Sequence, residues 1–231
     1  MKTVALIMAG GRGIRFGADI PKQFRNLLDR PLLSWTIMQF ERAEKVDEIV
    51  VVVPEDFLLY ANERVVNPYP FQKVTKIVVG GENRTESVSI GLKSIPYSTG
   101  YVAIHDGARP LVYHGDVDRV IEVAQRDRAA ILARPISDTV KRVEGEFIIS
   151  TLDRARLFLA ETPQVFQYDL INAAHNNPSG PKTATDDAYL VEILGFKVKV
   201  VIPEKPNLKV TTEDDLAMAR YFLEEEYESG N

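Results

Sequence analysis

Short apolar runs rich in β-branched residues, separated by segments of helical periodicity, constrain the fold of this 231-residue chain most strongly. Continuous apolar runs of this kind are typical of strands that are buried on both faces of a parallel sheet. We expect such strands at Val4–Met8, Ile49–Val53, Val74–Val79, Tyr101–Ile104, Ala130–Leu132 and Val198–Ile202. Their alternation with helices predicts an α/β fold with a mostly parallel sheet and helices on both faces.

Helices are indicated where apolar residues lie three or four positions apart. Four segments show this spacing: Leu33, Ile37 and Phe40; Val88, Leu92 and Ile95; Val117, Val120 and Ile121; and Leu216, Ala219 and Leu223. The last segment opens with Thr212 and Asp215, which have the spacing of a capping box. No repeat, low-complexity tract or linker interrupts the pattern, so we expect a single domain over residues 1–231.

A predicted β-hairpin interrupts the alternation of strands and helices. Its strands are Thr139–Val143 and Phe147–Ser150, and the charged turn between them contains Gly145. With its polar flanks, the insertion spans about residues 136–154. The hairpin is either a simple edge ribbon or an arm that reaches another subunit, and its residues leave both interpretations open.

The composition argues against a nucleic-acid-binding or membrane-surface protein. Hydrophobic residues make up 45% and charged residues 26% of the chain, and the net charge is −5. The absence of cysteine excludes disulfides, thiolate nucleophiles and thiolate metal sites. No apolar run approaches the ~20 residues of a membrane span, and no signal-peptide pattern opens the chain, so we expect a cytoplasmic protein.

The loop after the first predicted strand has the features of a phosphate-binding loop. Gly10, Gly11, Gly13 and Gly17 would let backbone N–H groups approach a phosphate, and the cations Arg12, Arg15 and Lys22 are interleaved with them or lie shortly after them. The loop lacks the pattern of a nucleoside triphosphatase P-loop, and it matches a dinucleotide-binding fingerprint only in part. A plain connecting turn is the alternative.

Two further strand ends carry polar residues. In the first, Gly80 and Gly81 lead through Glu82 to Ser87, whose hydroxyl is placed to reach a base or ribose or to cap a helix. In the second, His105–Pro110 comes directly after a strand and includes Asp106, a candidate ligand for Mg²⁺ that bridges phosphates. We interpret His105 as a packed residue, and Arg109 as a ligand contact or an internal partner of Asp106.

A fourth group of polar residues is spread over the last third of the chain. It consists of Arg154, Thr162-Pro163-Gln164, Thr185-Asp186-Asp187 and Lys209. Thr185 and Asp186 fit a helix N-cap at least as well as a ligand site. Taken singly, the two cations would be surface charges.

Taken together, these motifs resemble the isoprenoid-pathway cytidylyltransferases that make 4-diphosphocytidyl-2-C-methyl-D-erythritol. The resemblance runs through nearly the whole chain, in the order A-G-G-R-G-I-R-F-G, P-K-Q-F, G-G-E-N-R-T-E-S-V, H-D-G-A-R-P, D-T-V-K-R, T-P-Q-V-F, A-T-D-D-A and N-L-K-V-T-T-E-D-D. It implies a Rossmann-like fold, a homodimer formed through the β-arm, CTP as substrate, and Mg²⁺ or another divalent cation.

The resemblance also implies roles for individual residues. Arg15 and Lys22 match the pair that stabilises charge on the triphosphate, while Lys209 and the partner-borne Arg154 match residues that hold the methylerythritol phosphate. The positions that match contacts to CTP, its ribose and phosphates, or the metal are Ala9, Gly10, Gly81, Glu82, Ser87, Asp106, Gly107, Arg109 and Thr162. Thr139 and Thr185 match substrate-side positions, and Asp106 is the candidate metal ligand.

Three alternatives remain beside this resemblance. A ribitol-5-phosphate cytidylyltransferase would share the first loop, P-K-Q-F and T-P-Q, although the run Arg84–Leu92 resembles the methylerythritol enzymes more closely. Sugar-1-phosphate nucleotidyltransferases share the glycine-rich opening, but their R-L-x-P-L-T continuation is absent from this chain. A non-catalytic nucleotide-binding domain would need the glycine loops but not the late cations Arg154 and Lys209.

Overall fold

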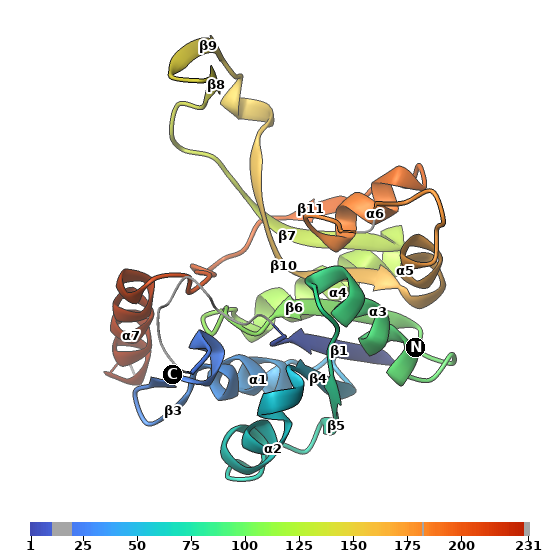
Figure 1. Cartoon of the computed structure of the whole chain (residues 1–231), viewed down its shortest axis with the longest axis vertical. Helices are drawn as coiled ribbons and strands as arrows, with labels where there is room; N and C mark the ends of the chain where they lie inside the picture. Colours follow the sequence, from blue (N-terminus) through green and yellow to red (C-terminus); the bar gives the residue numbers. More distant parts are fainter. Residues whose placement is uncertain (11–19, 182, 229–231) are drawn as a thin grey trace.

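A seven-stranded sheet forms the centre of the computed structural model, which describes residues 1–10, 20–181 and 183–228 (Figure 1). Its strands, in spatial order, are β11 (Lys199–Val201), β7 (Ala129–Pro135), β10 (Phe158–Gln167), β6 (Tyr101–Asp106), β1 (Thr3–Met8), β4 (Glu48–Val53) and β5 (Val74–Val79). Neighbouring strands are parallel except at β10, which runs antiparallel to both β6 and β7. The predicted α/β class and mostly parallel sheet are confirmed.

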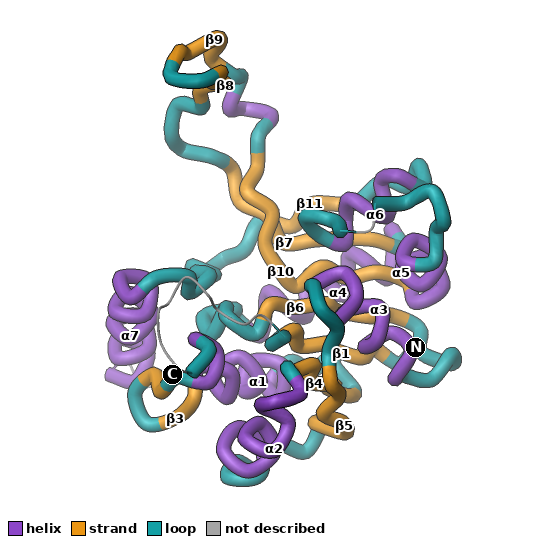
Figure 2. The backbone as a smooth tube through the Cα atoms, in the orientation of Figure 1, coloured by secondary structure: helices purple, strands orange, loops and turns teal. Residues whose placement is uncertain are grey.

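Helices pack around this sheet, and two small two-stranded ribbons lie outside it (Figure 2). The longer helices are α1 (Leu32–Arg42), α3 (Arg84–Ser94), α4 (His114–Asp127), α5 (Tyr168–His175), α6 (Asp187–Ile193) and α7 (Glu213–Glu228). The short helical turns are η2 (Lys22–Phe24), η3 (Glu55–Phe57), α2 (Leu58–Tyr60), η4 (Ala61–Val66) and η5 (Arg154–Arg156). The ribbons pair β2 (Asn26–Leu27) with β3 (Arg30–Pro31), and β8 (Lys141–Glu144) with β9 (Phe147–Thr151). None of the helices in the described ranges combines the length and apolarity needed to cross a membrane.

Side chains that alternate along the central strands build two cores, one on each face of the sheet. On β1, Ala5 and Ile7 lie in the cluster that contains the inner faces of α1 and α4. Val4 and Leu6 lie in the opposite cluster, with α3, α5 and α6. Helices therefore cover both faces, as the sequence pattern predicts.

Strand β10 is the element of the sheet that the sequence pattern missed. Its middle, Glu161–Gln164, combines polar residues with a proline, which is unusual inside a sheet. The register against β7 shifts between Ala160 and Gln164, so the proline falls where the ladder is interrupted. Glu161, Thr162 and Gln164 are nevertheless buried. The strand therefore brings polar groups into the interior, and a pattern of hydrophobic residues cannot predict such a strand.

The predicted hairpin is present and projects from the body as an arm, at the top of Figure 1. Its turn contains Gly145 at φ +59, a left-handed conformation that favours glycine. The arm exposes apolar side chains, and Phe147 and Ile148 are 76% and 64% exposed. The first strand begins at Lys141 rather than at the expected Thr139.

The capping box predicted at the last helix is also present. The Asp215 carboxylate accepts hydrogen bonds from the backbone N–H groups of Thr211 and Thr212 at 2.7 and 2.8 Å, and the Thr212 hydroxyl accepts one from Asp215 N at 3.2 Å. Burial alone would raise the pKa of Asp215, but these hydrogen bonds lower it. The box holds α7 at the end of the segment that carries Lys209.

We expect Asp215→Ala to lower the free energy of unfolding by about 1–2 kcal/mol, because several donors at the start of α7 lose their acceptor. Urea denaturation measures this change. Asp214→Ala, an exposed change in the same helical turn, is the control and should shift the free energy by less than about 0.5 kcal/mol. Equal effects of the two substitutions would contradict the role of the capping box.

Candidate active site

A cavity of about 1050 Å³ opens where the carboxyl ends of the parallel strands meet. Strand ends supply Met8, Val79 and Asp106, and the segments directly after them supply much of the remaining wall. The other lining residues are Ala9, Gly10, Lys22, Gln23, Pro54, Glu55, Gly80, Gly81, Glu82, Asn83, Arg84, Glu86, Ser87, Ile90, Ala108, Lys209 and Thr211. The cavity thus combines exposed backbone, from three glycines, with cations and carboxylates.

Ser87 organises the glycine-rich part of the wall. Its buried hydroxyl accepts a hydrogen bond from Gly81 N at 3.0 Å and donates one to Asn83 O at 2.8 Å. A Cβ at Gly10 would lie 3.2 Å from this hydroxyl, and one at Gly80 would lie 2.8 Å from it. A side chain at Gly80 would therefore displace Ser87, and one at Gly10 would press on it, so the two glycines let their loops approach Ser87 closely.

The helix after this turn begins earlier than expected. Instead of starting at Val88, α3 starts at Arg84, and Asn83 is its N-cap, with Oδ1 accepting from Glu86 N at 2.9 Å. The Glu86 carboxylate in turn accepts from Glu82 N at 2.8 Å. Asn83, rather than Ser87, is therefore the capping residue, and the earlier start places Arg84 in the cavity wall.

Asp106 is the electrostatic centre of the cavity. Its Oδ2 lies 2.7 Å from Lys209 Nζ, and its Oδ1 lies 3.4 Å from Arg84 Nε. Burial would raise the pKa of Asp106, but the positive charges of Arg84 and Lys209 hold it well below its usual range. The carboxylate is therefore ionised at neutral pH.

The donor set suits a divalent cation that is shared with phosphates rather than one held by protein alone. Within the described ranges, no group of three or more His, Asp or Glu side chains converges on a common point. Asp106 contributes one ionised carboxylate to the cavity wall. Mg²⁺ is commonly held by one or two carboxylates together with substrate phosphates, and Asp106 fits that mode.

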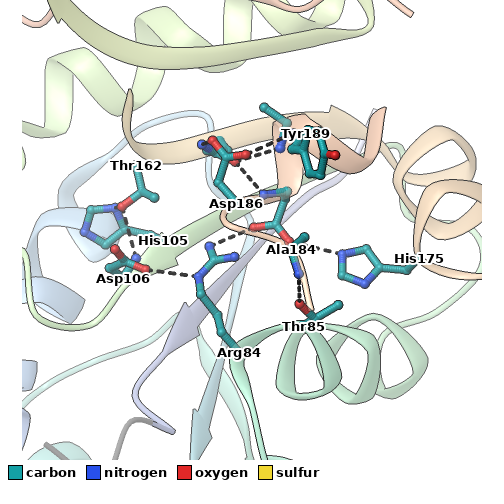
Figure 3. A network of polar contacts seen from close by, with 12 residues as sticks. Arg84, Thr85, His105, Asp106, Thr162, His175, Ala184, Asp186 and Tyr189 are labelled. Carbon is teal, nitrogen blue, oxygen red and sulfur yellow. Dashed lines mark hydrogen bonds and ion pairs between the residues drawn. The ribbon is translucent and has the colours of Figure 1, made fainter. Parts of the chain in front are cut away.

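Behind Asp106, a hydrogen-bonded chain fixes His105 and Thr162 (Figure 3). Asp106 N donates to the Thr162 hydroxyl at 3.1 Å, and this hydroxyl lies 3.0 Å from His105 Nδ1. His105 Nε2 lies 3.3 Å from Arg109 O, which assigns the proton to Nε2. Burial lowers the pKa of His105 to about 3, so the ring is neutral. The predicted packed role of this histidine fits these contacts.

Lys22 reaches the cavity from a short, well-anchored turn. The neighbouring Gln23 donates from Nε2 to Ala9 O at 2.6 Å, and Phe24 stacks on Phe57 with ring centroids 4.7 Å apart. Pro21 precedes the turn and restricts the backbone there. This anchoring joins Lys22 to the end of β1.

Lys209 lies on a segment that is hydrogen-bonded to the residues directly after β6. Val210 N donates to Ala108 O at 2.8 Å, and the Asn207 side chain donates to Thr162 O at 2.7 Å. Arg109 donates to Asn207 O at 2.7 Å, and its Nε lies 3.7 Å from Asp106. Arg109 is thus an internal partner of Asp106 in this structure.

The predicted site residues separate into four groups. Those that line the cavity are Ala9, Gly10, Lys22, Gly81, Glu82, Ser87, Asp106 and Lys209. Those buried behind its wall are Gly107, Arg109 and Thr162. Those exposed on the arm or before α6 are Thr139, Arg154 and Thr185. Arg15, like Gly11, Arg12 and Gly13, lies outside the described residues.

None of the described residues that line the cavity comes from the arm. Arg154 donates instead to Ser137 O at the base of the arm. Asp186, not Thr185, is the N-cap of α6, and its Oδ1 accepts from Tyr189 N at 2.9 Å. The N-cap interpretation of this segment therefore applies to Asp186.

Sequence reasoning missed Arg84 and the residues behind it. The run G-G-E-N-R-T-E-S was interpreted through its glycines and Ser87, but it also contains Arg84, whose guanidinium contacts Asp106 from the cavity wall. Asp187 pairs with Arg84 at 2.7 Å and with His175 Nε2 at 3.1 Å. The acidic pair in A-T-D-D-A was the available signal, but sequence spacing does not show that it reaches Arg84.

Comparison with known proteins gives matches that extend over nearly the whole chain. Residues 3–225 match the family model described as 2-C-methyl-D-erythritol 4-phosphate cytidylyltransferase. A relative of that name from Geotalea uraniireducens is 42% identical, over 96% of this chain and 97% of its own. One from Geobacter metallireducens is also 42% identical, over 97% and 99%.

Solved structures agree with the sequence comparison. The 4-diphosphocytidyl-2C-methyl-D-erythritol synthase of Anaerococcus prevotii superposes with a TM-score of 0.84 at 28% identity, covering 96% of each chain. The Thermus thermophilus 2-C-methyl-D-erythritol 4-phosphate cytidylyltransferase superposes with a TM-score of 0.77 at 34% identity, covering 96% of this chain and 98% of its own.

Proposed function

The chain belongs to the 2-C-methyl-D-erythritol 4-phosphate cytidylyltransferase family, and from that membership we propose how its cavity and arm share the reaction. It transfers the cytidylyl group of CTP to 2-C-methyl-D-erythritol 4-phosphate, which gives 4-diphosphocytidyl-2-C-methyl-D-erythritol and pyrophosphate. The match of the family model over residues 3–225 carries this assignment. The reaction belongs to isoprenoid biosynthesis. We propose that the enzyme is cytoplasmic and that residues 1–231 form a single domain.

The chemistry needs no general base. The attacking group is a phosphate monoester whose second pKa is about 6, so it is already largely ionised at pH 7. His105, the histidine beside Asp106, is neutral, buried and bonded at both ring nitrogens. The barrier lies instead in bringing one phosphate anion in line with another.

The cations of the site therefore have the main catalytic task in this proposal. Lys22 and Arg15 stabilise the charge that develops on the α-phosphate and the leaving pyrophosphate. Asp106 would hold a divalent cation, which when bound offsets charge on the triphosphate. Lys209 orients the attacking phosphate in this proposal. Its ammonium group lines the cavity beside Asp106 and is partly exposed, so a phosphate that enters the cavity can contact it.

The glycine-rich wall is proposed to bind CTP. Gly81, Glu82 and Ser87 line the side of the cavity next to α3, where exposed backbone groups are available to a base edge. Ala9 and Gly10 lie at the end of β1, toward the phosphates. Gly107, Thr162 and Arg109 support the part of the cavity around Asp106 from behind. Gly107 N donates to Met8 O, and the Thr162 hydroxyl accepts from Asp106 N. Arg109 donates to Asn207 O.

The arm is proposed to form a homodimer and to complete the partner's site. Val143, Phe147, Ile148 and Ile149 are all more than half exposed, an apolar surface that a second copy would cover. Arg154 lies on the same arm, outside the cavity of its own protomer. Arg154 and Thr139 would then contact the polyol phosphate bound by the partner, with Thr185 on the substrate side.

We expect Arg154→Ala to raise the KM for 2-C-methyl-D-erythritol 4-phosphate by roughly 10- to 100-fold, because a charge-assisted hydrogen bond is lost. The affinity for CTP, measured by calorimetry, should stay nearly unchanged. An equal loss of both affinities would contradict the proposed division of labour.

A mixed dimer tests whether Arg154 acts across the interface. In a heterodimer of Arg154→Ala and Lys22→Ala protomers, one site keeps both its own Lys22 and the arginine of the partner. Activity should recover to about half that of the wild-type dimer. The assay uses 2-C-methyl-D-erythritol 4-phosphate well below the raised KM of Arg154→Ala. If each Arg154 serves its own protomer, both sites carry a lesion and activity stays near that of the Arg154→Ala homodimer or below it.

The substrate assignment is tested by pyrophosphate release from CTP with each polyol phosphate. Turnover with 2-C-methyl-D-erythritol 4-phosphate, and little with ribitol 5-phosphate, is the expected result. Preference for ribitol 5-phosphate would replace the proposed substrate, and no turnover with either would leave a nucleotide-binding domain.

A further inference from the structure

Arg84 connects the carboxylate at the cavity wall to a second, fully buried carboxylate. Its Nε lies 3.4 Å from Asp106 Oδ1, and a terminal guanidinium nitrogen lies 2.7 Å from Asp187 Oδ2. We propose that Asp187 is a positioning residue for cytidylyl transfer: it holds Arg84 in place, and Arg84 in turn fixes the Asp106 carboxylate. This inference rests on the proposed function of the cavity.

Asp187 has the burial and the partners needed to remain charged. Its side chain is 1% exposed, and a buried carboxylate is strongly unfavourable unless paired. Burial would raise the pKa of Asp187, but the positive charge of Arg84 and the hydrogen bond from His175 Nε2 lower it. An ionised Asp187 gives Arg84 a fixed counterion that no ligand in the cavity can reach.

The backbone around Asp187 is anchored from two sides. Asp187 N and Ala188 N both donate to Gln164 Oε1 at 3.0 Å, which ties the start of α6 to β10. Ala184 N donates to Thr85 Oγ1 at 3.0 Å, which ties the preceding segment to α3 (Figure 3). Since Thr85 is the residue directly after Arg84, both ends of the Arg84–Asp187 ion pair are held by the same framework.

Lys209, a second cavity-lining cation on Asp106, is held differently from Arg84. Its side chain is 42% exposed, compared with 28% for Arg84. Within the described ranges, Asp106 is the carboxylate that pairs with Lys209, whereas Arg84 has two such partners. When a ligand competes for Asp106, Arg84 keeps Asp187, while Lys209 is available to an incoming phosphate. Asp187 thus makes Arg84 the fixed cation and Lys209 the movable one.

Asp187→Asn tests the proposal, since asparagine keeps the shape but removes the charge. We expect kcat to fall roughly 10- to 100-fold, with a smaller change in the KM for CTP, as for other losses of supporting groups behind a reactive site. Asp169→Asn is the matched control: it makes the same change at an exposed aspartate in the first turn of α5, outside this framework. Its kcat should equal that of the wild type.

A double-mutant cycle with Arg84→Met separates positioning from a merely structural role. If Asp187 acts through Arg84, Asp187→Asn should add little to the loss of kcat already caused by Arg84→Met. Multiplicative losses, or wild-type kcat in Asp187→Asn, would overturn the proposal. A wild-type enzyme that fails to turn over CTP and 2-C-methyl-D-erythritol 4-phosphate would instead refute the proposed function.

Arg84→Lys provides a second test if Asp187→Asn does not fold. A lysine keeps the charge, but its single ammonium group cannot span both carboxylates as the planar guanidinium does. We expect Arg84→Lys to lose kcat while melting within a few degrees of the wild type. Wild-type kcat in this variant would show that bridging to Asp187 is not required.

Discussion

Lys22→Ala is expected to lower kcat on the order of 10²-fold or more, because it removes a preorganised positive charge from the transition state. The size of the effect depends on how Lys22 is held. Gln23 ties its turn to Ala9, and Phe24 stacks on Phe57, so the ammonium group needs little reorganisation when the reaction begins. Steady-state kinetics with saturating CTP and 2-C-methyl-D-erythritol 4-phosphate measure the loss.

The control for this substitution is Lys93→Ala, which removes an exposed lysine from the last turn of α3. It should keep the wild-type kcat and thereby exclude an effect of net charge alone. CTP affinity in Lys22→Ala should fall less than kcat, since the proposed contact strengthens as charge develops. Near-wild-type kcat in Lys22→Ala would remove Lys22 from the mechanism.

The second large effect is a loss of stability in mild acid caused by His105. Its pKa is lowered from 6.5 to about 3 in the folded protein, so the unfolded chain binds the proton first as the pH falls. Protonation therefore favours unfolding, and stability is lost as the pH drops through the unfolded-state value. Between pH 7 and pH 5, His105 should lower the free energy of unfolding by about 2 kcal/mol.

Chemical denaturation at pH 7 and pH 5 measures this difference. His105→Asn keeps a polar side chain near Thr162 but has no titrating ring, so its stability should depend less on pH in this window. Asp106 and Asp187 have lowered pKa values, so their contributions to stability are lost as the pH falls from the ordinary pKa of aspartate, 3.8, through the lower folded-state values, a range that lies below this window. An unchanged pH slope in His105→Asn would show that the buried ring is not the cause.

Hydrophobic patterning predicted the part of the fold in which burial depends on residue type. The helices on both faces agree with their apolar spacing, and Val74–Val79 is a strand with the predicted bounds. The expectation that this strand is buried on both faces is wrong, because β5 lies at the edge of the sheet and its residues are half-buried or exposed. Strand β10 was missed because Thr162 and Gln164 are buried as polar groups with specific partners. Such partners come from β6 and α6, far away in the sequence, so local pattern cannot predict the strand.

The candidate site shows the same division. Glycines and cations near strand ends could be assigned to one cavity, because parallel strands end at the same edge of a sheet. Arg84 could not be distinguished from Arg109 in this way: both lie close to Asp106, but Arg84 lines the cavity and Arg109 is bonded behind its wall. The proposed role of Asp187 depends on its ion pair with Arg84, which is distant in sequence, so the sequence alone could not predict it.

A crystal structure with CTP and Mg²⁺ would show directly whether this cavity is the cytidylyl-transfer site. We expect the cytosine beside Gly81 and Ser87, and the triphosphate between Gly10 and Lys22, with its α-phosphate on the side of Lys209. CTP bound elsewhere on the chain, or with its triphosphate directed away from Lys22, would contradict this assignment.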